Sequence, residues 1–185
     1  MIFVEISCRS LLAIVFAYSA GAKLRSRGSF RRFSDWLADL PVPGARHADA
    51  LAAAVAAAEV SIVILIALPW TTMAGFGLAA ATLAIFITGT SLAVARGTTA
   101  PCACFGTSGT QRGKHHIARD TGLLAVAVIG AATSGAHGAR PGGVAVSLAA
   151  AVVIAVFVIF LDDWLSLFIP PAALAPPATL TSANR

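Results

Sequence analysis

Apolar residues gather in five long runs that are separated by shorter polar segments. The runs cover residues 2–24, 47–68, 71–95, 117–134 and 144–161. About 20 apolar residues in an α-helix cross the hydrocarbon core of a bilayer. Backbone groups in lipid must also be paired within the chain, which favours helices for such runs. The pattern therefore predicts an all-α fold: a polytopic membrane helix bundle in the cell membrane, with the lipid bilayer as its surroundings.

The polar segment after the first run has a helical pattern of its own, at residues 29–40. Its apolar side chains recur at helical spacing: Phe30, Phe33, Leu37 and Leu40. Trp36 lies beside them, while arginines and aspartates fall largely on the other faces. This arrangement is typical of a helix in the membrane interface. The alternative is a solvated loop, and in either case Pro41 and Pro43 end the segment.

The composition excludes an ordinary soluble domain. Of the 185 residues, 58% are hydrophobic and 11% charged, whereas soluble domains have about 25% charged residues. We expect one membrane domain over residues 1–169 and a disordered tail rich in proline, alanine and threonine over 170–185. The net charge of +5 does not indicate nucleic-acid binding, because basic residues in membrane proteins collect in cytoplasmic loops.

The basic residues raise a question of sidedness. With five spans, the connections at residues 25–46 and 96–116 lie on one side of the membrane and carry most of the arginines and lysines. The positive-inside rule places that side in the cytoplasm. Cytoplasmic thiols are kept reduced, however, and the second connection contains two cysteines. The side of the membrane that carries them stays open.

Cys102 and Cys104 are the strongest candidates for chemistry. A disulfide between them would close a very small ring, and strained disulfides are reduced readily. Cationic side chains in the same connection favour the reactive thiolate, and Arg119 at the start of the next run is one of them. Two alternatives are inert thiols and a soft-metal site. His115 and His116 lie nearby, but their spacing to the cysteines matches no standard zinc motif, so we expect no metal.

Glu59 interrupts the second run near its middle. A carboxylate at membrane depth costs several kcal/mol unless it is protonated, paired or hydrated, and it is a functional candidate by default. The alternative is a protonated side chain that bonds to a neighbouring helix. Cys8, near the start of the first run, is expected to pack in the core.

Taken together, these features resemble the MauE family, methylamine-utilisation membrane proteins related to the DoxX-like four-helix proteins. The matching features are Arg9, the stretch Phe16-Ala-Tyr-Ser19-Ala-Gly21-Ala-Lys23, Glu59, Cys102-Ala-Cys104-Phe105-Gly106 and Arg119-Asp120. The chain departs from the family pattern at Ala103 and Asp120, where the family has glycine and asparagine. It also departs in its fifth apolar run. The resemblance implies a DoxX-like four-helix core, and the fifth apolar run predicts an extra C-terminal transmembrane helix after it.

The resemblance also implies a membrane redox or maturation factor that works with a thioredoxin-like partner. Such proteins are associated with maturation of the disulfide-rich small subunit of methylamine dehydrogenase. The resemblance maps the family's cysteine pair onto Cys102 and Cys104. Our hypothesis for the mechanism adds Arg119, which favours the thiolate, and Glu59, which moves a proton. An apolar bundle with one carboxylate could also hold a quinone-like electron carrier, although no quinone motif is visible. The alternatives are a small-solute or ion carrier centred on Glu59 and a non-catalytic assembly partner.

Overall fold

The computed structural model describes residues 2–39, 47–95, 113–134 and 141–160. Within these ranges the regular elements are helices, and the all-α prediction is confirmed. The helices are α1 (Ile2–Leu24), α2 (Arg27–Asp39), α3 (Ala48–Ala67), α4 (Thr72–Ala95), α5 (Gly113–Thr133) and α6 (Pro141–Ile159). Segments Phe3–Leu24, Ala48–Ala67 and Thr72–Ala93 are long and apolar enough to cross a bilayer. In α6, Val144–Ile159 forms a shorter apolar helix.

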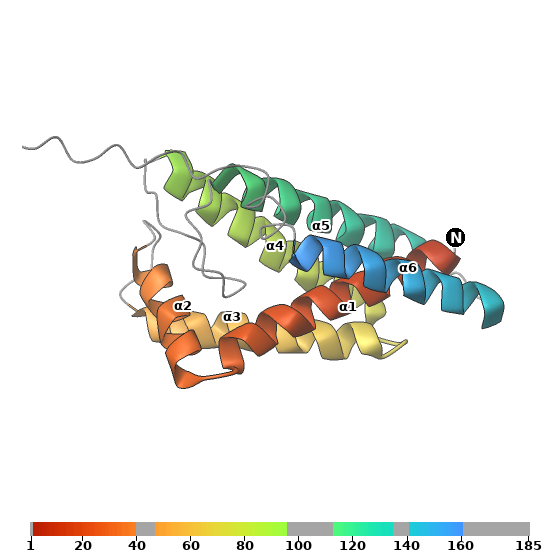
Figure 1. Cartoon of the computed structure of the whole chain (residues 1–185), viewed down its shortest axis with the longest axis horizontal. Helices are drawn as coiled ribbons and strands as arrows, with labels where there is room; N and C mark the ends of the chain where they lie inside the picture. Colours follow the sequence, from red (N-terminus) through yellow and green to blue (C-terminus); the bar gives the residue numbers. More distant parts are fainter. Residues whose placement is uncertain (1, 40–46, 96–112, 135–140, 161–185) are drawn as a thin grey trace, which may run out of the picture.

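Helix α1 lies at the centre of the packing (Figure 1). It contacts α2, α3, α5 and α6, while α4 packs against both α3 and α5. The core is built from apolar side chains of these helices. It includes Leu12, Val15, Phe16, Ile62, Ile66, Phe76 and Leu123. Since helices in lipid gain little from the hydrophobic effect, close packing of such side chains must supply much of the attraction between them.

The amphipathic helix α2 turns its apolar face toward the bundle. Phe33, Trp36 and Leu37 are buried in a cluster with Ala52 of α3 and Ala93 of α4. Phe33 and Trp36 stack with their ring centroids 5.9 Å apart. Arginines of α2 lie on the exposed side. The helical pattern of residues 29–40 thus corresponds to a helix whose aromatic face contacts protein.

Two glycines permit close contact between helices. A Cβ atom on Gly130 of α5 would lie 2.4 Å from the Phe76 ring of α4, and a Cβ atom on Gly75 would lie 2.9 Å from the backbone nitrogen of Ile66. Gly122, on the same helix as Gly130, has no such neighbour within 4 Å. The ring of Phe76 therefore packs against the bare backbone of α5, where any side chain would displace it.

Arg9 joins α1 to the C-terminal end of α3. Its Nε donates to the carbonyl oxygen of Ile66 at 2.5 Å, and its Nη2 donates to that of Ala67 at 2.8 Å. The last carbonyls of a helix have no partner within the helix, and the helix dipole makes that end negative. The guanidinium group donates to these unpaired carbonyls and places a positive charge at the negative end of the helix. It therefore fixes the position of this end of α3 against α1.

Replacing Gly130 by alanine should destabilise the bundle, because the added methyl group overlaps the Phe76 ring. We expect a loss of about 1–3 kcal/mol, the usual cost of overpacking. Thermal unfolding in detergent, followed by circular dichroism, measures the loss. The matched control is Gly122→Ala, which should unfold at or above the wild-type temperature, since alanine is the better helix former. Equal effects of the two substitutions would contradict the contact.

Candidate functional site

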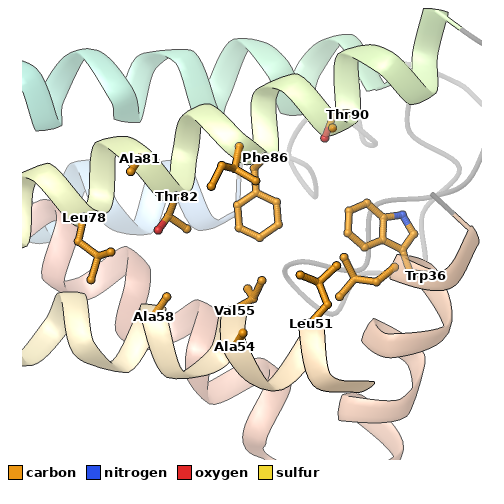
Figure 2. Close-up of a pocket in the computed structure, with 13 residues that line it drawn as sticks. Trp36, Leu51, Ala54, Val55, Ala58, Leu78, Ala81, Thr82, Phe86 and Thr90 are labelled. Carbon is orange, nitrogen blue, oxygen red and sulfur yellow. The ribbon is translucent and has the colours of Figure 1, made fainter. Parts of the chain in front are cut away.

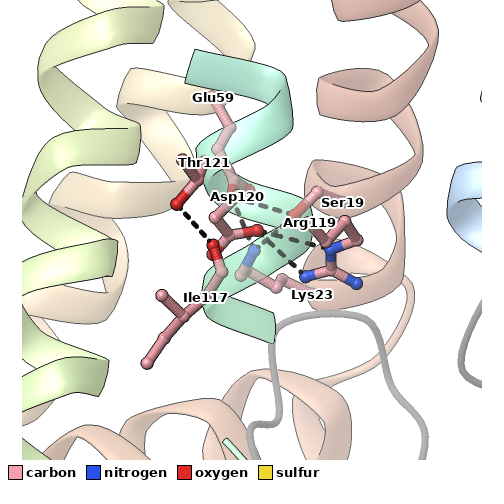
Figure 3. Close-up of polar contacts among 7 residues, drawn as sticks. All are labelled: Ser19, Lys23, Glu59, Ile117, Arg119, Asp120 and Thr121. Atoms are coloured by element: carbon pink, nitrogen blue, oxygen red, sulfur yellow. Dashed lines mark hydrogen bonds and ion pairs between the residues drawn. The ribbon is translucent and has the colours of Figure 1, made fainter. Parts of the chain in front are cut away.

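Three side chains from two helices form a buried polar cluster inside the bundle (Figure 3). The Nζ of Lys23 lies 2.6 Å from Oε1 of Glu59 and 2.7 Å from Oγ of Ser19. The hydroxyl of Ser19 donates to the same carboxylate oxygen at 2.9 Å. Lys23 and Glu59 are each 2% exposed. A carboxylate and an ammonium group are therefore held together away from both water and lipid.

The local sequence explains how the cluster forms. Ser19 and Lys23 are four residues apart on α1, so they lie one turn apart on one face. Glu59 belongs to the buried face of α3, which otherwise carries Ala52, Ala56, Ile62 and Ile66. The alanines leave room for the carboxylate to approach α1. On its other side the Lys23 ammonium group lies 4.8 Å from the centre of the Phe33 ring, a cation–π contact that brings α2 into the site.

The second oxygen of Glu59 has no donor. Oε2 is buried, and it makes no hydrogen bond to any group in the described residues. Such an acceptor normally costs about 1–3 kcal/mol, and more when charged. Glu59 also lines a cavity of about 30 Å³ whose walls include Ser19, Phe86, Arg119 and Asp120. A cavity of this size, with these polar side chains in its wall, has room for one water molecule.

Arg119 and Asp120 form a second ion pair on the wall of this cavity. Nη2 of Arg119 lies 3.3 Å from Oδ1 of Asp120, and Arg119 is 7% exposed. The structure thus brings the predicted residues Glu59 and Arg119 to one cavity, from α3 and α5. Lys23 is the member that the sequence did not assign to the site. The available signal for Lys23 was its position four residues after Ser19, in a chain whose next apolar run carries a carboxylate.

The other predicted site residues are placed as follows. Cys102 and Cys104 lie outside the described residues. Cys8 is buried in the core, as expected. In the ranges that the structure describes, no group of three or more histidine, cysteine, aspartate or glutamate side chains could hold a metal ion. The side chains of His115 and His116 also lie outside the described part.

The two cysteines lie in the sequence between α4, which ends at Ala95, and α5, which begins at Gly113. Arg119 is in the second turn of α5 and Phe86 is in the C-terminal half of α4, and both border the cavity of Glu59. The helices on either side of the cysteines in the sequence therefore both line this cavity.

The family model for methylamine utilisation protein MauE matches residues 1–133. The chain belongs to the MauE family. The match ends at the last residue of α5, so the polar cluster and the cysteine pair lie inside the family region and α6 lies outside it. No curated protein and no solved structure matches the chain. Family membership and the membrane-capable helices together identify a membrane protein.

Breaking the Lys23–Glu59 pair should be costly, because the remaining charge would be buried without a partner. We expect Glu59→Gln and Lys23→Met each to lower the free energy of unfolding by about 3–5 kcal/mol. The double variant Glu59→Gln, Lys23→Met should lose clearly less free energy of unfolding than the two single losses added together. A double-mutant cycle from thermal or denaturant unfolding in detergent gives the coupling energy.

Arg31→Met, at an exposed position of α2, is the control and should change stability by no more than about 0.5 kcal/mol. If the losses of Glu59→Gln and Lys23→Met simply add, the two side chains are not coupled.

Proposed function

We propose that this MauE-family chain is a multi-pass cell-membrane factor for thiol–disulfide exchange and protein maturation. Its reactive groups are Cys102 and Cys104, and its partner is a thioredoxin-like protein. The observation that carries the proposal is a shared cavity: α4 and α5, which precede and follow the cysteines in the sequence, both line the cavity beside Glu59, and Arg119 belongs to its wall. Because the family is that of the methylamine utilisation protein MauE, we propose that the client belongs to methylamine utilisation.

The exchange step is balanced between the two proteins. One thiolate of the pair attacks a sulfur of the partner's disulfide, which forms a mixed disulfide and releases a thiolate on the partner. The second cysteine of the pair then attacks the mixed disulfide. Cys102 and Cys104 end as a disulfide, and the partner ends as a dithiol that has gained two electrons. The reverse sequence oxidises the partner, and the strain of a Cys-x-Cys ring favours that direction.

The described residues supply charge and proton handling around this step. Arg119 is a permanent cation at the start of the helix that follows the cysteines, and a nearby cation favours the thiolate over the thiol. Within the described residues, Glu59 has one oxygen bonded to Lys23 and Ser19 and a second oxygen without a hydrogen bond, and the residue lines the cavity. We assign to that free oxygen the acceptance and release of the proton that each thiol loses or gains.

A second candidate, a carrier centred on Glu59, is favoured by the same free carboxylate oxygen. The adjoining cavity, at about 30 Å³, has room for a single water molecule. That size excludes a larger solute and leaves a proton or a small monovalent cation as the species that such a carrier would move, of which the proton is tested first. For a proton carrier, Glu59→Gln should abolish proton flux into vesicles that contain the protein, while the double cysteine variant keeps it. Flux that depends on the cysteines instead would reject the carrier.

For the thiol–disulfide factor, replacing either Cys102 or Cys104 by serine should remove productive exchange. With a thioredoxin-like protein that lacks its resolving cysteine, the wild-type chain should form a trapped mixed disulfide, visible on a non-reducing gel. Cys102→Ser and Cys104→Ser together should abolish the band. Cys8→Ser is the matched control, because Cys8 is buried in the core, and it should leave trapping unchanged. A band of equal intensity in the double variant would reject the proposed function.

A further inference from the structure

A second, larger pocket lies between α2, α3 and α4 (Figure 2). Its volume is about 410 Å³, within the range of small-molecule sites in proteins. The wall is almost entirely apolar and includes Trp36 of α2, Leu51 and Val55 of α3, and Phe86 of α4. Ile85 of the same wall is 73% exposed, on a helix of membrane-crossing length. A compound dissolved in the lipid could therefore enter from the side of the bundle.

Two threonines interrupt this apolar wall. Thr82 and Thr90 of α4 line the pocket and are buried. Elsewhere, helical threonines donate to the carbonyl oxygen four residues earlier: Thr72, Thr88, Thr121 and Thr133. By contrast, no hydrogen bond joins Thr82 or Thr90 to another residue of the described part. Two hydroxyl donors are thus available to a ligand inside an otherwise apolar pocket.

The spacing of the two hydroxyls selects the ligand. Thr82, Phe86 and Thr90 are four residues apart in sequence, so they form one stripe along α4 with the ring between the hydroxyls (Figure 2). Eight residues of helix extend about 12 Å. Two hydrogen bonds of about 2.8 Å each take up part of that length. The remainder suits a ligand that carries two acceptors at opposite ends of a single ring, with the Phe86 ring as a surface for stacking.

The pocket also adjoins the polar cluster. Phe86 borders both this pocket and the small cavity of Glu59. A single aromatic ring therefore separates a lipid-accessible pocket from a buried carboxylate with a free oxygen. This arrangement suits a ligand that takes up protons when it is reduced.

We propose that the pocket between α2, α3 and α4 binds a membrane benzoquinone, with its ring against Phe86 and its two carbonyl oxygens accepting from Thr82 and Thr90. This inference rests on the proposed function and names its electron acceptor. The balance is one dithiol to one quinone: two S–H bonds break, one S–S bond forms, and two electrons and two protons convert the quinone to the quinol. Glu59, which lines the small cavity that Phe86 also borders, is the group to which we assign the protons of this step.

Binding can be tested through the fluorescence of Trp36. In the full-length chain with W70F and W164F, Trp36 is the remaining tryptophan, and a benzoquinone with a short alkyl tail should quench it in a saturable manner. Thr82→Val and Thr90→Val should each weaken binding about three- to tenfold, the loss expected for one hydrogen bond. Thr88→Val is the matched control on the same helix and should bind as the parent does.

An alkylbenzene with the same tail tests the competing occupant, a lipid chain. It should displace the quinone poorly. If it competes as well as the quinone does, and the valine variants bind normally, the pocket accepts any apolar chain and the proposal is overturned. Absence of saturable quenching overturns it as well.

The double variant Cys102→Ser, Cys104→Ser separates the quinone site from the proposed function. It should bind the quinone normally, because the pocket belongs to α2, α3 and α4. In the wild-type chain, failed trapping beside intact quinone binding would remove the thiol-exchange function, and intact trapping beside absent quinone binding would remove the quinone site.

Discussion

The contact between Lys23 and Glu59 is the interaction on which the arrangement of the helices depends. Neither group can be left alone at this depth, since an unpaired charge inside an apolar bundle is far more costly than a paired one. The pair therefore requires α1 and α3 to meet at one register, and Ser19 and Phe33 complete the surroundings of the ammonium group. The other contacts of α1, α2 and α3 are compatible with this register. A polar interaction thus specifies the fold in an environment where apolar contacts discriminate weakly.

The sequence predicts much of this structure because its strongest signals are local. Long apolar runs predict helices, and a carboxylate within such a run is conspicuous, so Glu59 could be singled out. Lys23 could not be assigned as its partner, because it lies at the end of a run among other basic residues. Hydrophobic pattern does not say which helices touch. The Cys102–Cys104 pair and the number of membrane crossings stay predictions, as does the DoxX-like core.

Other features were invisible for a different physical reason. Threonine in a helix usually satisfies its hydroxyl on its own backbone, so nothing in the sequence separates Thr82 and Thr90 from Thr88. Only the packing of α2 over α3 and α4 leaves those two side chains facing a pocket. The aromatic pattern of residues 29–40 was recognisable, but whether it faces lipid or protein depends on long-range contacts. Here Trp36 contacts the bundle and helps to close the pocket.

The hydrogen bonds of Arg9 have a consequence for motion. Arg9 holds α1 to one end of α3, and Lys23 holds it to Glu59 about 21 Å further along α1, at 1.5 Å per residue. A slide of α1 past α3 by one turn, about 5.4 Å, would break both attachments at once. α1 and α3 must then behave as a rigid frame. A rearrangement within the bundle then falls to the other helices, among them α4 and α5, which precede and follow the cysteines in the sequence.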